Sequence, residues 1–140
     1  MASGKSQLYV FDMTAGTTEK YNPDMYVFSP QIKGNIMGWL DTNNSPTAGL
    51  YIVEGNGVTK KLADAVTGYY IGDGIVVYCQ NQRMFCYFVE KDLTLPLSKE
   101  DKKAMMIGGA NGIVFWYDIT QTYERDIVKY AEVNSSSWRK

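Results

Sequence analysis

The residue types that carry most enzyme chemistry are scarce in this chain. The sequence of 140 residues contains no histidine, so the commonest general base and the commonest metal ligand are both missing. Serine, threonine and cysteine side chains therefore have no imidazole partner to activate them, and no Gly-x-Ser-x-Gly segment occurs. The sequence predicts that the protein is not an enzyme that works through an activated nucleophile.

The acidic residues are spaced as single side chains and not as a cluster. They fall one at a time at the ends of apolar segments, where carboxylates cap turns and blunt sheet edges. A calcium loop needs several oxygen ligands at short spacing, and glycosidase chemistry needs two acids at a defined separation. We therefore expect no metal site, no cofactor and no catalytic carboxylate pair. The acids in question are Asp41, Glu54, Asp73, Glu90 and Asp118.

The only two cysteines, Cys79 and Cys86, lie on opposite arms of an expected hairpin. Two thiols without histidine cannot build a structural zinc site. A turn centred on Gln82 and Arg83 places the two cysteines directly opposite, where they could be bridged. A turn centred one position earlier offsets them, and we then expect the thiols to point to opposite faces. The favoured reading is two reduced, buried thiols, because cysteine behaves as a small core residue.

Glycine-rich segments at 72–74 and 108–112 resemble phosphate-binding loops in composition only. A phosphate loop lies between a strand and the N-terminus of a helix, whereas an apolar segment with the composition of a strand follows each segment here. We therefore expect tight turns at both places.

The aromatic side chains remain as candidates for binding, with 11 Tyr, 3 Trp and 5 Phe. Most should belong to the core, because Trp39, Tyr78 and Trp116 recur at equivalent positions of a repeat. Neighbouring residues of a strand point to opposite faces, so one member of each adjacent aromatic pair should be exposed or buried against a partner. Exposed Tyr and Trp are typical of interfaces and of sugar-stacking sites. The candidate interface or ligand aromatics are Tyr69, Tyr70, Trp116, Tyr117 and Trp138.

The elements that must position these side chains are short strands. Residues 75–80 and 84–90 are rich in β-branched and aromatic residues, and the polar segment between them is typical of a hairpin turn. The same pattern occurs throughout the chain, and the one charged segment that could start a helix, 98–103, is too short. The sequence predicts an all-β protein.

Three repeats organise the chain. Similar apolar strands that end in an acid begin at residues 8, 50, 86 and 127. Each of the first three is followed by a turn, a polar strand, a third strand, a glycine turn and a fourth strand. We therefore expect one domain of three repeats, at about 8–49, 50–85 and 86–126, with a closing strand at 127–133 and a polar tail at 134–140. Four-stranded units of about 40 residues are typical of β-propeller blades.

The repeat pattern resembles that of TolB-type and related six-bladed β-propellers. The best match is the segment 49–62, Gly-Leu-Tyr-Ile-Val-Glu-Gly-Asn-Gly-Val-Thr-Lys-Lys-Leu. The resemblance covers nearly the whole chain, but its motif is degenerate and implies a type of blade, not a particular activity. The rival architecture is a β-trefoil, which also has three repeats of about 40 residues and closes as a monomer.

Three blades are too few to close a ring, because propellers have at least four. Since the chain starts with the third strand of one blade and ends after the third strand of another, we expect two chains to close a six-bladed ring, or this chain to be half of a longer propeller. The strands expected at the closure compete for one position. Their residues are Leu8, Tyr9, Val10 and Phe11 at one end and Ile127, Val128 and Tyr130 at the other.

These patterns favour a non-enzymatic module for assembly or protein binding, acting as a homodimer or with the remaining blades of a larger propeller. A lectin-like protein with one shallow aromatic site per repeat, binding a glycan, is the alternative, and a fragment of an enzyme is a weaker third. The net charge of −1, with scattered Lys and Arg, does not fit a nucleic-acid surface. No apolar run reaches the roughly 20 residues of a membrane span, and the polar N-terminal segment does not read as a signal peptide.

Overall fold

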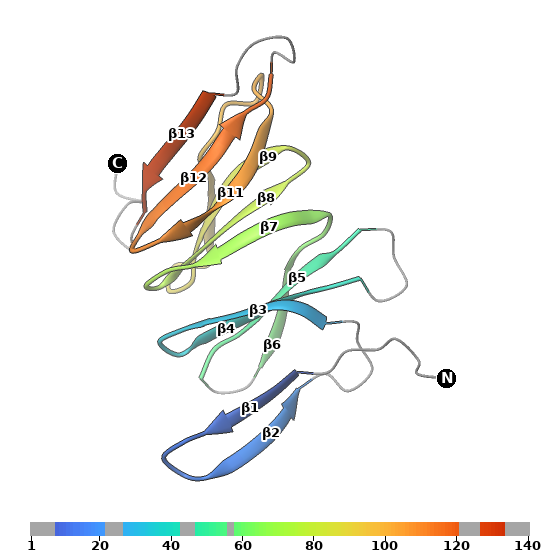
Figure 1. Cartoon of the computed structure of the whole chain (residues 1–140), viewed down its shortest axis with the longest axis vertical. Helices are drawn as coiled ribbons and strands as arrows, with labels where there is room; N and C mark the ends of the chain where they lie inside the picture. Colours follow the sequence, from blue (N-terminus) through green and yellow to red (C-terminus); the bar gives the residue numbers. More distant parts are fainter. Residues whose placement is uncertain (1–7, 22–26, 43–46, 56–57, 121–126, 134–140) are drawn as a thin grey trace.

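The computed structural model describes residues 8–21, 27–42, 47–55, 58–120 and 127–133, and the described part of the chain contains strands and no helix (Figure 1). No described segment is therefore a helix that could cross a membrane. The strands are β1 (Leu8–Asp12), β2 (Thr17–Tyr21), β3 (Val27–Lys33), β4 (Ile36–Asp41), β5 (Gly49–Val53), β6 (Thr59–Ala63), β7 (Val66–Ile71), β8 (Ile75–Gln80), β9 (Arg83–Phe88), β10 (Leu93–Pro96), β11 (Ala104–Ala110), β12 (Ile113–Asp118) and β13 (Ile127–Glu132).

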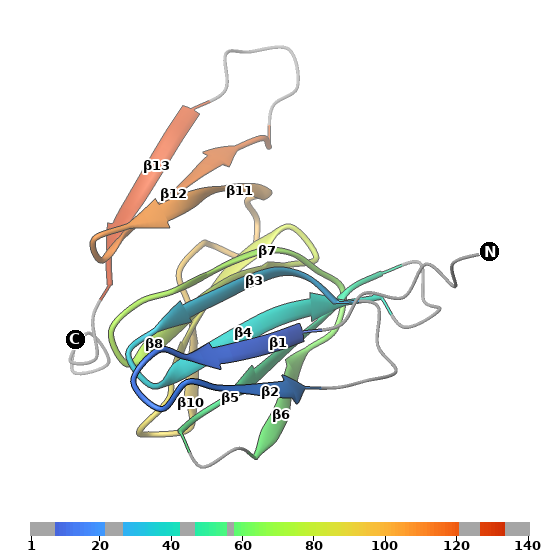
Figure 2. The same cartoon turned by 60° about the horizontal axis from the view of Figure 1, so that its bottom comes forward.

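These strands form four antiparallel sheets in which each strand pairs with its neighbour in the chain. Two sheets are complete four-stranded units, β3–β6 and β7–β10, while β1–β2 is a two-stranded hairpin and β11–β13 has three strands. The sheets follow one another in a stack, with β1–β2 at one end and β11–β13 at the other (Figures 1 and 2). The predicted all-β fold of blade-like antiparallel repeats is confirmed.

The trefoil alternative is wrong. A trefoil closes six of its strands into a barrel, but the described strands form four separate sheets that pack face to face. The sheets are also offset from the sequence repeats. Residues 50–85, for example, supply β5 and β6 to one sheet and β7 and β8 to the next, so each repeat links two neighbouring sheets.

Recurring turns position the strands. Gly34, Gly74 and Gly112 follow the first strand of successive sheets, and all three have positive φ angles of 60°, 73° and 78°, which glycine adopts without steric cost. The predicted turn at 72–74 is therefore confirmed, whereas of the segment 108–112 only residues 111 and 112 form the turn, because β11 continues to Ala110. Asn81 and Gln82 also have positive φ angles, of 51° and 62°, as a two-residue type I′ hairpin requires.

This tight turn decides the relation of the two cysteines. Cys79 lies opposite Met84, and Cys86 lies opposite Val77, so the thiols are offset and both are free and buried. The expectation that an offset would place them on opposite faces is wrong. Moving the turn centre by one position changes the register by two residues, and a shift of two keeps the side chains on one face. Both cysteines accordingly belong to one buried cluster.

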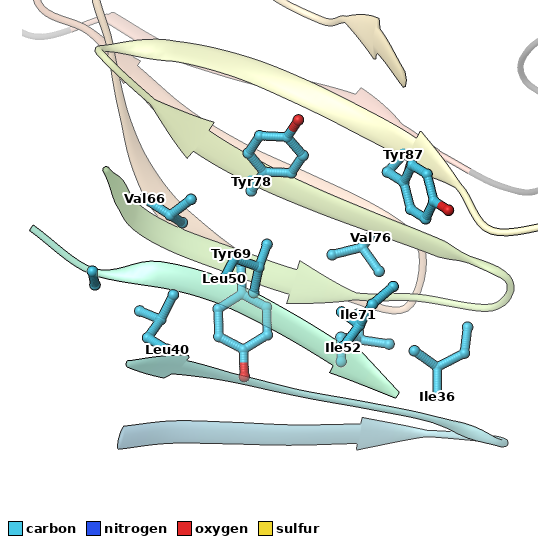
Figure 3. Close-up of a cluster of buried hydrophobic side chains, with 11 residues drawn as sticks. Ile36, Leu40, Leu50, Ile52, Val66, Tyr69, Ile71, Val76, Tyr78 and Tyr87 are labelled. Carbon is cyan, nitrogen blue, oxygen red and sulfur yellow. The ribbon is translucent and has the colours of Figure 1, made fainter. Parts of the chain in front are cut away.

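The core consists of layers between neighbouring sheets. One layer joins β3–β6 to β7–β10 through residues such as Leu50, Val76 and Tyr78 (Figure 3). A second layer joins β7–β10 to β11–β13 and includes Ile75, Met84 and Trp116. The sheet β7–β10 is therefore covered on both faces, which explains why five consecutive residues of β8 are buried.

Candidate functional site

The most unusual surface of the molecule is the face of the β11–β13 sheet that points away from β7–β10. Its residues share a face because they lie directly opposite one another in neighbouring strands: Met105 and Val128 flank Tyr117, and Phe115 pairs with Tyr130. We call these five residues the end face. The rings of Phe115 and Tyr130 lie 6.3 Å apart between centroids.

The end face is exposed although it is apolar and aromatic. The exposed fractions are 48% for Met105, 38% for Phe115, 54% for Val128 and 70% for Tyr130. The alternating residues of the same strand, Val114 and Trp116, point to the other face and are 0% and 6% exposed, so the sheet is well packed on one side only.

The preceding sheet provides an internal comparison. Each strand β4, β8 and β12 begins with isoleucine, and counting from it places Val77 of β8 at the position of Phe115 and Cys79 at the position of Tyr117. Val77 and Cys79 are 0% and 1% exposed, because the next sheet covers them. In β11–β13 the same positions have no covering sheet among the described residues. Large exposed apolar patches of this kind mark interaction surfaces.

The opposite end of the stack also exposes aromatic side chains. Tyr9 and Phe11 are two residues apart in β1, so they share one face of the hairpin, and they are 56% and 59% exposed. The molecule thus has two different apolar ends, one on the hairpin β1–β2 and one on the sheet β11–β13.

The predicted pair Tyr69 and Tyr70 does not lie at either end. The two rings point to opposite faces of β7, as expected, but each meets a neighbouring sheet. Tyr69 is buried in the layer toward β3–β6, and Tyr70 packs against the layer toward β11–β13. The expectation that one of them is exposed, or buried against a partner, is wrong because the central sheet of this chain is covered on both faces.

Tyr69 instead connects two sheets through polar contacts. Its hydroxyl donates to the carbonyl of Gly38, 2.9 Å away, and also contacts the carbonyl of Ser29. The amide of Gln31 completes the link, donating to the Tyr69 carbonyl at 2.8 Å and accepting from the Ile71 N–H at 3.1 Å. A bulge between Phe28 and Gln31 places these groups. Burial raises the pKa of the Tyr69 phenol, so this residue is a neutral hydrogen-bond donor and not a base.

Replacement of Tyr69 by Phe should lower the free energy of unfolding by about 1–2 kcal/mol, because the buried carbonyl of Gly38 loses its donor. Urea unfolding measures this change. The control Thr59→Val removes an exposed hydroxyl in β6, outside the end face, and should change the stability by less than about 0.5 kcal/mol. Equal effects of the two substitutions would contradict the role of the Tyr69 hydroxyl.

Tyr70 requires glycine on the facing sheet. A Cβ on Gly109 would lie 2.5 Å from the Tyr70 ring, and the Tyr70 hydroxyl accepts a hydrogen bond from the N–H of Gly112 at 2.9 Å. The glycines at 108–112 therefore serve both the turn and the close approach of two sheets.

Trp116 and Tyr117, the other adjacent pair, divide between the two faces of β12. Trp116 is buried against β7–β10, while Tyr117 is half-buried on the end face. Trp138 and the side chains of Leu8, Val10 and Ile127 lie outside the described residues. Val128 and Tyr130, proposed for ring closure, do lie on the end face. Met105 and Phe115 were missed, because the alternation of residues in a strand does not show which face of its sheet is covered.

One polar cluster joins β6 to the β9–β10 turn. Lys60 donates to the Tyr87 hydroxyl at 2.9 Å, and Tyr87 donates to the Asp92 carboxylate at 2.7 Å. The Lys60–Asp92 ion pair raises the pKa of Lys60 and lowers that of Asp92, while burial raises the pKa of Tyr87. At neutral pH these directions keep Lys60 protonated, Asp92 ionised and the Tyr87 phenol neutral.

The surface hollows found in the described part of the chain are small. A basic one of about 140 Å³ lies between Trp116, Asp118 and several lysines, and a polar one of about 150 Å³ adjoins Asp41 and Tyr51. Both are below the roughly 300 Å³ of ordinary ligand pockets. A third, of about 200 Å³, adjoins the end of β13. Within the described ranges, no group of three or more metal-binding side chains comes together.

Neither protein-family models nor curated proteins give a match to this chain.

Proposed function

We propose that this chain is a non-enzymatic assembly module whose sheets are blades of a six-bladed β-propeller closed by a second copy. The observation that carries this proposal is the exposure of the end face. Phe115 and Tyr117 occupy positions that are buried in the preceding sheet, where the next sheet covers them. A covering sheet from a second chain would bury the same side chains here.

The two ends of the stack suit a head-to-tail contact. The end face lies on the sheet β11–β13, and the exposed residues Tyr9 and Phe11 lie on the hairpin at the opposite end (Figure 1). Different surfaces that meet between identical chains form closed rings when the rotation closes, and filaments when it does not. Two chains contacting each other at both ends would leave neither apolar surface exposed.

The incomplete sheets support the same proposal. The hairpin β1–β2 follows the order of a third and a fourth strand, and β11–β13 ends at a third strand. One incomplete sheet from each chain would combine at each junction, so that two chains with two complete sheets each give six blades. The resemblance to TolB-type repeats is consistent with this number.

A lectin-like function is less well supported. A glycan platform in each repeat would need exposed aromatic side chains at equivalent positions. The aromatic residues that do recur, Trp39, Tyr78 and Trp116, are 0%, 5% and 6% exposed, so they are occupied by packing between sheets.

The solution mass tests the proposal. Multi-angle light scattering on a sizing column, over a dilution series, should give the mass of two 15.8 kDa chains. A monomer at every concentration would overturn the proposal. A mass that grows continuously with concentration would indicate open filaments and would overturn the closed ring.

A further inference from the structure

The outer edge of the β11–β13 sheet has an unfilled position as well as an uncovered face. In both complete sheets the third strand, β5 or β9, pairs on its outer edge with a fourth strand, β6 or β10. Within the described residues β13 pairs with β12 alone. An unpaired strand edge is a template for a strand from another chain.

The pairing of β13 with β12 determines which backbone N–H groups of β13 point to the outer edge. The N–H of Val133 donates to the Gly112 carbonyl at 2.7 Å, continuing the register in which Glu132 lies opposite Ile113. Because hydrogen-bonded and non-hydrogen-bonded pairs alternate in antiparallel sheets, the N–H groups of Lys129 and Ala131 point toward β12. Those of Val128, Tyr130 and Glu132 point to the open edge.

The neighbouring sheet shows a gap at the same place. A hollow of about 200 Å³ lies beside the end of β13, between Glu132 and Val133 and the outer strands of the central sheet. That central sheet contributes mostly apolar side chains: Cys86, Phe88, Leu95, Pro96 and Leu97. A fourth strand beside β13 would extend the β11–β13 sheet over β10 and cover this hollow.

The chain itself contains a strand of the missing kind. The hairpin at the other end pairs β1 with β2 over five residue pairs, and in chain order β1 corresponds to β5 and β9, while β2 corresponds to β6 and β10. We propose that β2 of a second copy pairs antiparallel with the outer edge of β13. The joint sheet then has the order β11–β12–β13–β2–β1, with the last two strands from the second chain. In the single chain β1 lies on the β4 side of the neighbouring sheet and β2 on the β6 side (Figure 2), so this order requires the hairpin of the second chain to turn over and present β2 to β13.

This strand order follows from the directions of the strands and from the fact that β13 already occupies the third position. Strands in the third position of successive blades run in the same sense, so β1 of a second copy would lie parallel to β13, whereas β2 lies antiparallel, as in both complete sheets. β13 cannot be treated as an empty place, because six residue pairs join it to β12. The incoming hairpin therefore adds to the edge instead of replacing β13. This inference rests on the proposed assembly of two chains.

A proline substitution in β13 tests whether the outer edge of this strand pairs with a second chain. Tyr130→Pro removes the outward N–H but leaves the ladder to β12, whereas the matched control Tyr130→Thr removes the same ring and keeps the N–H. If the edge pairs with a second chain, the proline variant should dimerise at least about tenfold more weakly than the threonine variant, because one interchain hydrogen bond is lost and its acceptor is left unpaired. Sedimentation over a concentration series measures both constants. Equal dimerisation constants would overturn the inference.

Cysteine crosslinking identifies the incoming strand. Chains carrying Glu132→Cys are mixed, after dissociation by dilution, with chains carrying Thr17→Cys or Thr18→Cys, which lie in β2 on alternate faces. Oxidised glutathione should then produce a disulfide-linked dimer with one of the two, seen on a non-reducing gel. The native thiols do not interfere, because Cys79 and Cys86 are 1% and 0% exposed.

The control mixture pairs Glu132→Cys with Thr59→Cys, an exposed position in β6, and should give no linked dimer. Absence of a link to β2 in a protein that still has the mass of two chains would overturn this inference and leave the proposed assembly standing. A monomeric wild-type protein would overturn both.

Discussion

Charging the end face should convert the dimer into monomers without unfolding the chain. In the double variant Val128→Glu/Tyr130→Glu, two side chains that are 54% and 70% exposed in the single chain become carboxylates in a contact that the assembly would bury. Central aromatic and aliphatic contacts typically contribute about 2 kcal/mol each, so the loss of two contacts at each of the two junctions should raise the dissociation constant by at least about a thousandfold. Sedimentation equilibrium measures this change.

The control for this variant is Val58→Glu, because Val58 is apolar and 76% exposed but lies between β5 and β6, outside the end face. It should dimerise like the wild type. The circular dichroism spectrum of the double variant should also match that of the wild type, since the substituted side chains are outside the core. Unchanged dimerisation of the double variant would show that the end face is not the contact.

The strands could be predicted from the sequence because local patterns specify them. Glycine turns before Ile36, Ile75 and Ile113 and β-branched or aromatic runs after them mark the second strand of each sheet, and the structure confirms these elements. The packing between sheets could also be predicted, since Trp39 and Trp116 recur at one position of the repeat.

The alignment of one repeat with the next was harder to predict from the sequence. Alignment of the repeats by residue type matches Tyr51 with Tyr87. In the structure Trp39 pairs with Tyr51, and its equivalent in the next sheet, Tyr78, pairs with Phe85. The structural equivalent of Tyr51 is therefore Phe85, two residues before Tyr87. The β8–β9 turn has only two residues, whereas residues 42–48 connect β4 to β5, and a comparison of residue types does not detect this difference in loop length.

The candidate site could be predicted least of all, because exposure depends on neighbours that are distant in sequence. The residues Tyr69 and Tyr70 resemble Trp116 and Tyr117 as adjacent aromatics in strands. The first pair is covered on both sides because its sheet lies in the middle of the stack. The second lies in the last sheet, so only Trp116 is buried. Position in the stack, and not residue type, separates a core residue from a contact residue.

Truncation of Trp39 should produce the largest loss of stability in this chain. Trp39 is 0% exposed, packs with Val27, Met37 and Val53, and stacks on Tyr51 with a centroid distance of 6.0 Å and an interplanar angle of 6°. Trp39→Ala should lower the free energy of unfolding by about 3–5 kcal/mol, because burial is lost and a cavity remains. Urea unfolding of the variant and the wild type at equal concentration measures the change.

The control Trp39→Phe separates packing from hydrogen bonding. The indole N–H is buried and has no hydrogen-bond partner among the described residues, so its removal relieves a buried unsatisfied donor while the smaller ring loses some contact. The loss should be about 1 kcal/mol. A loss as large as that of Trp39→Ala would contradict the packing argument.

Because a dimer stabilises the folded chain by mass action, the unfolding midpoints should rise with protein concentration for both Trp39 variants but not for Val128→Glu/Tyr130→Glu. Folding depends on the layer that contains Trp39, and assembly depends on the end face, so the two effects should be separable.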